Sequence, residues 1–310
     1  MEYKCVDLGS ERCPCNLMES GQCYMCNLIK TGKCNCSSSW QGVCPYNEYL
    51  QYGKKTTKNA VVRIFKIYKI KSYSPTLTVI TIETPIAFAL KSRELGAFLM
   101  LNWKSWFVPI SVLRVTLEYE NQVGYIDLAV NATGPKTIGL LKASVVGQEL
   151  MIKGPFYSGV LGRKVFQKNV ESIIIAKGIA VMPLINIKDK LKGSVLYFGL
   201  DTSKLPQAFL DKYLKDIAFE KIDLEKDIFE ISENIKERYG YYMGAHNEKP
   251  NIFFMMSPHY IGRLLSLSNF NENKVILPNH SNMCCGEGVC GSCSYTDEKG
   301  VTVKKCKCID

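Results

Sequence analysis

The sequence lacks several features that would place it in a common class of protein. Residues 45–283 contain no cysteine, and the 310-residue chain has only three histidines. No apolar run reaches the roughly 18 residues that a membrane helix needs, because the longest one, residues 173–187, is interrupted by Lys177. The first residues include no apolar stretch of the kind that signal peptides carry. These absences predict a cytoplasmic protein with no membrane span, and they argue against a secreted disulfide scaffold.

The fourteen cysteines are gathered at the two ends of the chain. Eight lie between positions 5 and 44, and six lie between positions 284 and 308. Cysteines that act only as small hydrophobic side chains would be scattered through a core, and thiols in a reducing compartment do not pair as disulfides. The arrangement therefore predicts metal sites at both ends. The candidate N-terminal ligands are Cys5, Cys13, Cys15, Cys23, Cys26, Cys34, Cys36 and Cys44.

A short repeat occupies the N-terminal segment. CNLMESGQC is followed by CNLIKTGKC and CSSSWQGVC, with a glycine two positions before each closing cysteine: Gly21, Gly32 and Gly42. A glycine at that place lets the chain reverse with a positive φ. Because the segment has few large aliphatic residues, we expect bound metal to supply its folding energy. Eight thiols match two four-thiolate sites, for which [4Fe–4S] clusters are favoured and zinc stays open.

Positive charge is present but is not concentrated. The chain has 39 Lys and Arg against 29 Asp and Glu, a formal net charge of +10. These cations form no block of five or six, and no nucleic-acid-binding motif accompanies them. An oxidised cluster with its thiolates carries roughly −2, so three clusters would leave a net charge of about +4. The sequence predicts no nucleic-acid partner and leaves the oligomeric state open.

The length and a hydrophobic content of 46% predict two or three globular domains. After an expected linker at residues 54–60, short strand patterns at residues 77–82, 114–119 and 123–130 indicate a small antiparallel barrel. The pattern of residues 61–70 fits either a helix or a strand.

From Gly162 onward, strand patterns alternate with helical patterns. The strand patterns occupy residues 172–176, 194–200, 217–222 and 251–256. The helical patterns occupy residues 207–214, 227–238 and 258–267. Such alternation implies a parallel sheet covered on both faces. We therefore predict a multidomain protein with four parts: a Cys-rich metal domain (1–58), an antiparallel β-barrel (59–162), a doubly wound α/β domain (163–278) and a cysteine-containing tail (279–310).

The tail has the most specific motif. Cys285, Cys290, Cys293 and Cys306 are separated by four, two and twelve residues. The four-then-two spacing is that of plant-type [2Fe–2S] proteins, whereas a zinc ribbon prefers paired two-residue gaps. The intervening glycines allow a tight loop whose backbone N–H groups face sulfur. The spacing predicts one [2Fe–2S] cluster, with Cys284 and Cys308 as competing thiols.

With this tail, the sequence from about residue 61 to the end resembles the electron-transfer subunit of the heterodimeric dihydroorotate dehydrogenases, which belongs to the ferredoxin–NADP reductase superfamily. The resemblance implies a flavin-binding barrel, a nucleotide-binding α/β domain and a C-terminal [2Fe–2S] loop. It also implies FAD as a cofactor and a partner oxidoreductase or catalytic subunit. The N-terminal Cys-rich segment lies outside the resemblance.

The family's flavin motifs can be followed along the chain with substitutions. Valine replaces the arginine of its Arg-Pro-Leu-Ser element at residue 108, and Lys136 replaces the second glycine of its Gly-x-Gly-Thr element. A Gly-Pro-Leu-Gly turn that closes the family's barrel corresponds to residues 154–157. The positions that the resemblance implies for flavin binding are Pro109, Ser111, Gly134, Thr137 and Gly154.

The nucleotide motif departs further from the family. Its Gly-Gly-x-Gly-x-Ala-Pro element corresponds to residues 177–183, where Lys177 and Ala180 replace two glycines and Gly178 remains as the implied cofactor-binding position. A Cβ at those positions would keep a diphosphate from the backbone. Met256 stands where the family has a cysteine beside the nicotinamide. We therefore expect weak or absent oxidation of NAD(P)H.

Three functions follow, in order of preference. The first is an iron–sulfur flavoprotein that relays electrons between FAD and a partner oxidoreductase. The second is a multicluster electron-wire subunit that has lost flavin or NAD(P)H binding, and the third is a non-redox zinc scaffold. No histidine lies in a recognisable hydrolase motif, so the sequence predicts no catalytic residue.

Overall fold

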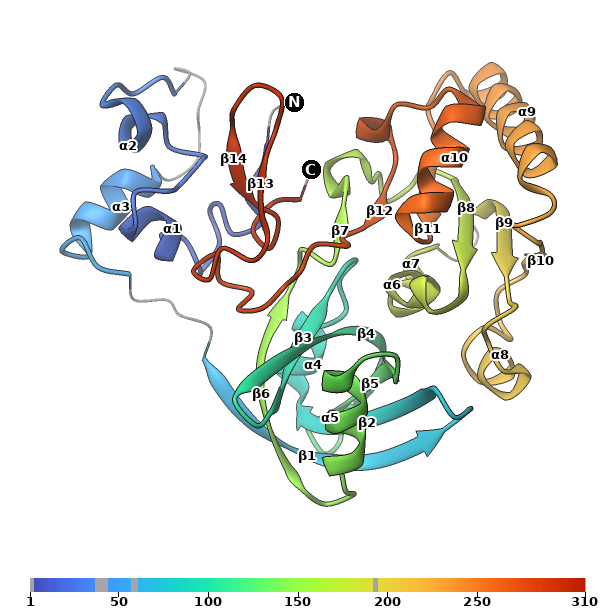
Figure 1. Ribbon diagram of the computed structural model, residues 1–310, viewed down its shortest axis with the longest axis horizontal. Helices are drawn as coiled ribbons and strands as arrows, with labels where there is room; N and C mark the ends of the chain where they lie inside the picture. Colours follow the sequence, from blue (N-terminus) through green and yellow to red (C-terminus); the bar gives the residue numbers. More distant parts are fainter. Residues whose placement is uncertain (1–2, 37–43, 57–60, 192–194, 310) are drawn as a thin grey trace.

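The computed structural model describes residues 3–36, 44–56, 61–191 and 195–309. Figure 1 shows a barrel, an α/β region beside it and a group of short helices at the N-terminus. The C-terminal segment returns to lie beside these short helices, so the two ends of the chain are neighbours. Gly42 of the expected repeat and residues 57–60 of the expected linker lie outside the described residues.

The barrel closes in the strand order β1-β2-β5-β4-β3-β6, and all of these pairs are antiparallel. Its strands are β1 (Val62–Ser72), β2 (Leu77–Pro85), β3 (Phe98–Trp103), β4 (Trp106–Glu118), β5 (Val123–Asn131) and β6 (Glu149–Phe156). Ile80, Leu99 and Leu128 fill the interior and have no exposed surface. The helices α4 (Ile86–Lys91) and α5 (Pro135–Ala143) pack against it. The expectation of an antiparallel barrel is confirmed.

Most of residues 61–70, whose sequence pattern fits either a helix or a strand, belong to strand β1. Phe65 and Ile67 point into the barrel, and β1 pairs with both β2 and β6. The pairing register with β2 shifts between Ile67 and Lys69. Such a bulge inserts one extra residue and breaks the alternation of a strand. This irregularity explains why the period of the sequence did not decide between helix and strand.

The α/β region contains four parallel strands in the order β10-β9-β8-β11. They are β8 (Ser172–Lys177), β9 (Val195–Asp201), β10 (Glu220–Lys221) and β11 (Asn251–Met255). Helices α6 (Met182–Asn186), α7 (Lys188–Leu191), α8 (Gln207–Tyr213), α9 (Ile228–His246) and α10 (Pro258–Ser268) accompany them, as do the 3₁₀ turns η1 (Arg163–Val165), η2 (Gly178–Val181) and η3 (Glu272–Lys274). Ile174 faces the core that contains α6 and α8, whereas Ile173 and Ile175 face the core of α9 and α10. The sheet is covered on both faces, as expected.

One expected strand is wrong in extent. Only Glu220 and Lys221 of residues 217–222 pair with β9. Ile217 and Phe219 instead pack against the hydrophobic core. Their apolar side chains produced a strand-like pattern because they are buried, without any strand pairing.

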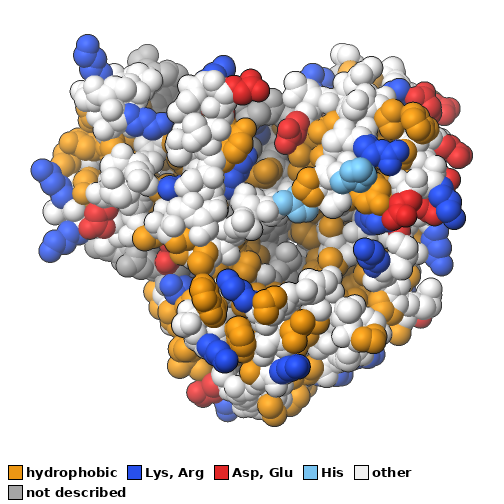
Figure 2. All heavy atoms as spheres, viewed as in Figure 1, with side chains coloured by type: hydrophobic (Ala, Val, Ile, Leu, Met, Phe, Trp, Pro, Cys, Tyr) orange, Lys and Arg blue, Asp and Glu red, His pale blue; other side chains and the backbone are white. Residues whose placement is uncertain are grey.

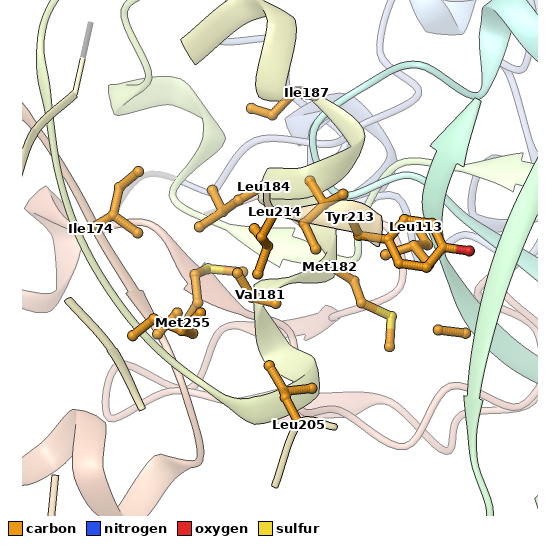
Figure 3. Close-up of a cluster of buried hydrophobic side chains, with 14 of the residues drawn as sticks. Leu113, Ile174, Val181, Met182, Leu184, Ile187, Leu205, Tyr213, Leu214 and Met255 are labelled. Carbon is orange, nitrogen blue, oxygen red and sulfur yellow. The ribbon is translucent and has the colours of Figure 1, made fainter. Parts of the chain in front are cut away.

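Helix α6 lies between the sheet and the barrel. Figure 3 shows Met182 and Leu184 in a cluster that also contains Leu113 of barrel strand β4. The Tyr213 hydroxyl donates to the buried Asp127 carboxylate of β5 over 3.1 Å. Apolar packing and a buried hydrogen bond therefore both join the barrel to the α/β region.

The two ends of the chain form small elements of their own. The N-terminal helices are α1 (Asn16–Glu19), α2 (Asn27–Thr31) and α3 (Pro45–Gln51). In the tail, β12 (Leu277–Pro278) pairs with β7 (Val160–Leu161), and β13 (Ser294–Thr296) forms a hairpin with β14 (Thr302–Lys304). On the face shown in Figure 2, Lys and Arg are spread over the surface instead of forming one patch. None of the helices in the described ranges is long and apolar enough to cross a membrane.

Candidate functional site

The tail brings its four predicted ligands together with one loop and one hairpin. Cys285, Cys290 and Cys293 lie in the loop before β13, and Cys306 follows β14. The Lys305 amide donates to the Cys293 carbonyl over 2.9 Å, which closes the hairpin. The hairpin therefore returns Cys306 to the loop although twelve residues separate it from Cys293.

The barrel holds this loop in place. Gly286 has a φ of +70°, and a Cβ there would lie 3.0 Å from the Phe156 ring of β6. The Ser158 hydroxyl donates to the Cys306 carbonyl over 2.7 Å, and the Asn279 amide donates to the Ser158 carbonyl over 2.8 Å. Glycine is required at position 286 because a side chain would clash with the aromatic ring and strain the backbone.

The four thiols form a connected group. The Cys306 thiol hydrogen-bonds with Cys285 and Cys293, and Cys285 also hydrogen-bonds with Cys290. The Cys306 contact lowers the pKa of Cys285 to about 4 and that of Cys293 to about 6. The same contacts raise the pKa of Cys306. The contacts with Cys306 thus favour the thiolate forms of Cys285 and Cys293, and the thiolate is the form that binds metal.

Backbone N–H groups also point at sulfur. The Glu287 amide donates to Cys285 Sγ over 3.3 Å. Within the described ranges, no group of three or more His, Cys, Asp or Glu side chains is arranged to hold a metal ion. The match of the tail to an iron–sulfur cluster therefore depends on its donors, since connected thiols and an amide donor suit such a cluster chemically.

The eight N-terminal cysteines lie around the short helices. Cys13 and Cys26 are buried, Cys34 and Cys36 are exposed, and the other four are half-buried. All fourteen cysteines of the chain are described, and none forms a disulfide. Cys308 is fully buried in a cluster with Tyr3, and its backbone bridges to that of Cys5.

The positions implied for flavin binding lie on three elements. They are Pro109 and Ser111 on β4, Gly134 and Thr137 at the start of α5, and Gly154 on β6. The Gly134 amide donates to Thr137 Oγ1 over 3.2 Å, and that hydroxyl donates to the Gly134 carbonyl over 3.0 Å. Thr137 therefore fixes the beginning of α5.

Two lysines add positive charge near these positions. The Lys136 ammonium lies 4.2 Å from the centre of the Trp106 ring, at the tip of the β3–β4 hairpin. The Lys153 ammonium lies 4.9 Å from the centre of the Phe107 ring and 3.6 Å from the Glu287 carboxylate of the tail. The start of α5 and the tail-facing side of the barrel each have a cation that could contact a diphosphate.

The carboxyl end of the α/β sheet is filled by the chain's own charges. Lys177 at the end of β8 forms an ion pair with Asp201 at the end of β9, and Glu225 lies 3.7 Å from the same ammonium. The Lys177 and Asp201 side chains are only 12% and 3% exposed. Burial alone would raise the pKa of Asp201, but hydrogen bonds from Lys177 and Ser203 lower it overall. This crevice is where doubly wound folds bind nucleotides.

The turn after β8 is buried as well. Gly178 has a φ of +57° and begins η2, which leads directly into α6. Figure 3 shows that Val181 and Leu184 point into the core cluster. The turn and the helix that follow β8 thus begin among core side chains, and Val181 and Leu184 also line a cavity of about 630 Å³.

His280 connects the tail to the end of the sheet. Its Nε2 atom lies 2.8 Å from the carbonyl oxygen of Met256, which directly follows β11. His280 also lines a cavity of about 390 Å³ beside α10. The histidine thus has a structural contact at the position where the resemblance places a nicotinamide.

The sequence analysis did not identify three charged residues of these regions, namely Asp201, Asp7 and Lys307. Asp201 has a weak signal in the sequence, because an acidic residue ends the apolar strand β9. Asp7 and Lys307 form a buried ion pair between the two ends of the chain, and no spacing in the sequence predicts it. Such long-range pairs become visible only in the folded chain.

The comparisons with known proteins concern the fold. No family model matches the sequence, and no curated protein matches it. An NADH-dependent reduced ferredoxin-NADP oxidoreductase, in a study of flavin-based electron bifurcation, matches 79% of this chain over 86% of its own, with 15% identity and a TM-score of 0.54. Phthalate dioxygenase reductase, described as a modular structure for electron transfer from pyridine nucleotides to [2Fe–2S], matches 80% of this chain over 95% of its own, with 14% identity and a TM-score of 0.52. The chain therefore has the fold of ferredoxin–NADP reductase-type flavoproteins.

Proposed function

We propose that this protein is an electron-transfer subunit that relays electrons between FAD and a partner oxidoreductase through a [2Fe–2S] cluster. The observation that supports this most is the connected group of Cys285, Cys290, Cys293 and Cys306 beside a flavoprotein-type barrel. A flavin can accept two electrons together and pass them on one at a time. An iron–sulfur cluster carries one electron at a time, so the two groups can act in sequence.

The chain's own residues would hold and orient these groups. The four tail thiols would bind the cluster, while Phe156 and Ser158 keep the loop against the barrel. Ser111 and the first turn of α5, with Lys136, would hold the flavin and its diphosphate. Lys153 joins the two sites through its ion pair with Glu287, next to Cys285. The barrel would therefore keep flavin and cluster at a fixed separation.

Anaerobic purification tests this proposal. We expect a twin-peaked flavin absorption, extractable FAD, and iron with acid-labile sulfide in equal amounts. Iron and sulfide without flavin would reject the flavoprotein proposal and leave a cluster-only relay. Zinc without sulfide would reject both and favour the non-redox scaffold.

A second candidate is a multicluster relay that does not use NAD(P)H. It is favoured by the Lys177–Asp201 pair and by the buried η2 turn, because they fill the place of the diphosphate. Lys177 is already neutralised by carboxylates, so it is not available to a phosphate. Electrons would then enter or leave through the N-terminal metal sites and a protein partner.

Anaerobic stopped-flow mixing with NADH and with NADPH tests whether this crevice accepts a nucleotide. We expect no rapid bleaching of the protein's visible absorption with either nucleotide. Dithionite should bleach the same sample, which shows that the centres are reducible. Rapid bleaching by a nucleotide would show that the crevice works despite the ion pair.

A further inference from the structure

The eight N-terminal cysteines have a larger repeat than their paired spacing shows. Positions 5, 13, 15 and 23 have separations of eight, two and eight, and positions 26, 34, 36 and 44 repeat the same separations. We name these the first set (Cys5, Cys13, Cys15, Cys23) and the second set (Cys26, Cys34, Cys36, Cys44). Because the spacing is the same, we expect the four sulfur atoms of each set to be arranged in the same way.

The first set surrounds one small cavity. All four of its cysteines line this cavity, together with parts of α1 and the start of α3. Cys15 is the common neighbour, since its charge raises the pKa of Cys5, Cys13 and Cys23 in each case. Burial is the larger cause for all three thiols. Four thiols from one stretch of chain thus face a shared space.

The second set gathers around Cys36. Its thiol hydrogen-bonds with Cys34, and Cys44 and Cys26 are its next charged neighbours. These neighbours are the other three members of the second set. Cys23 and Cys26 also lie close together, so the two sets adjoin at that point.

Backbone amides donate to sulfur in the first set. The Asp7 amide donates to Cys5, the Gly9 amide to Cys13, and the Met25 and Cys26 amides to Cys23. An amide donor stabilises a thiolate and is the usual environment of a metal-bound cysteine. Three of the four thiols in the first set therefore have the support that a ligand needs.

The first set also contacts the tail. The Lys307 ammonium lies 2.5 Å from the Asp7 carboxylate, and their side chains are only 5% and 6% exposed. Lys307 directly follows the tail ligand Cys306, and its charge acts on both Cys5 and Cys15. A buried cation thus lies between the first set and the tail thiols.

Backbone and apolar contacts support the same arrangement. The Val6 amide donates to the Lys307 carbonyl over 2.8 Å. A Cβ on Gly288 would lie 2.9 Å from Leu17 Cδ2, so α1 packs directly on the tail loop. Figure 1 places α2, which belongs to the second set, on the side of these helices away from the tail. The spatial order is therefore tail, first set, second set.

We propose that the eight cysteines form two four-thiolate metal sites, one from each set, and that the first set is the neighbour of the tail cluster. Four thiolates suit an iron–sulfur cluster or Zn²⁺, and the test below distinguishes these metals. The ligand pairing is independent of the proposed function, while the spatial order rests on the proposed tail cluster. With iron at all three sites, the order describes a path for electrons from the second set to the tail.

Double variants of the full chain test the pairing. Cys13→Ser/Cys23→Ser removes two ligands of the first set, Cys13→Ser/Cys34→Ser removes one ligand of each set, and Gln22→Ala, at an exposed side chain of the same region, is the control. Iron, zinc and acid-labile sulfide are counted per chain after anaerobic purification. We expect the same-set variant to lose one site and the cross-set variant to lose two, with wild-type content in the control. Iron with sulfide identifies clusters, and zinc without sulfide identifies Zn²⁺.

Several outcomes would overturn the pairing. One is a Cys13→Ser/Cys23→Ser variant that loses as much metal as the cross-set variant, because that result places these two cysteines in different sites. Another is a wild-type protein with no metal beyond the tail site. The paramagnetic resonance signal of the reduced tail cluster shows in each variant that the rest of the chain is folded.

Spin relaxation tests the spatial order. With iron in the first set, the tail signal should relax faster than it does in Cys13→Ser/Cys23→Ser, whereas Cys34→Ser/Cys36→Ser should change it much less. If the sites hold zinc, the same comparison is made after exchange with paramagnetic Co²⁺. Equal effects of the two double variants would reject the order and leave the pairing standing. Absence of any tail signal would reject the proposed function instead, while the metal counts would still test the pairing.

Discussion

The two cysteine-rich ends of the chain differ in what holds them. The tail loop lies on the barrel, where Phe156 backs Gly286 and Ser158 holds the Cys306 carbonyl. The N-terminal helices have four, five and seven residues, which is too short for independent stability in water. The tail is therefore shaped by protein packing, whereas the proposed metal sites and the contacts with the tail would hold the N-terminal region.

The thiols show the same contrast. Hydrogen bonding with Cys306 lowers the pKa of Cys285 to about 4. Burial raises the pKa of Cys5 to about 12 and that of Cys13 to about 11. The contacts among the tail thiols thus favour the thiolate at Cys285, whereas burial disfavours it at Cys5 and Cys13.

Loss of one tail ligand should have the largest effect. Cys290→Ser removes a predicted ligand that is connected to Cys285, so we expect the paramagnetic resonance signal of the reduced [2Fe–2S] cluster to disappear or to change greatly. Cys284→Ser replaces the competing thiol next to Cys285, and an unchanged signal in that variant would leave Cys284 outside the ligand set. An unchanged signal in Cys290→Ser would reject the assignment.

Removal of metal should have the second-largest effect, and this effect should be confined to the N-terminal region. With a chelator under anaerobic conditions, we expect protease cleavage within residues 3–36 and 44–56 to become about tenfold faster, because the proposed metal sites would supply folding energy there. Cleavage within the barrel should change little. Limited proteolysis followed by mass spectrometry measures both rates. Equal resistance of the N-terminal region with and without metal would show that packing alone holds it.

This contrast also explains what the sequence could predict. The barrel, the parallel sheet and the three main helices α8, α9 and α10 follow from periodic patterns, because burial imposes those patterns. The grouping of the tail thiols follows from spacing and glycines. The Asp7–Lys307 pair and the packing of Leu17 on Gly288 join residues about 300 and 270 positions apart, and no local pattern encodes such contacts. The bulge in β1 and the half-buried Ile217 and Phe219 misled the periodic analysis for the same reason, since tertiary packing decided them.

Breaking the buried ion pair should weaken the contact between the two ends by about 3 kcal/mol. Asp7→Asn leaves the Lys307 ammonium buried without its carboxylate partner. Burial alone would lower the pKa of Lys307, but Asp7 and the thiols of Cys15 and Cys5 raise it overall. The pair therefore stabilises the fold fully below pH 10.5, and this contribution is lost as the pH rises above that value.

Native-state hydrogen exchange of the N-terminal amides measures this loss for Asp7→Asn. The difference between the wild type and the variant should shrink at high pH, where Lys307 loses its charge. A difference that is constant across this pH range would mean that the charge of Lys307 does not contribute to it.

Truncating the apolar contact should have a smaller effect. Leu17 is only 2% exposed and packs on Gly288, so Leu17→Ala should cost the N-terminal region about 2 kcal/mol through lost burial and a residual cavity. The same hydrogen-exchange experiment measures it. The tail signal should be unchanged, because the barrel holds the loop independently. A loss of that signal would show instead that the N-terminal region shapes the tail site.

The exposed ion pair between the two regions should matter least. Glu11 lies 3.1 Å from Lys91 of α4, but their side chains are 74% and 55% exposed. Hydrogen bonding with Lys91 lowers the pKa of Glu11, yet water and salt screen such a pair almost completely. Glu11→Gln should therefore leave exchange of the N-terminal amides unchanged at physiological salt, while Asp7→Asn accelerates it strongly. If both variants had equal effects, long-range charge attraction would hold the N-terminal region on the rest of the chain. A clear difference would assign that role to the buried contact beside Cys5 and Cys306, where the two cysteine-rich ends meet.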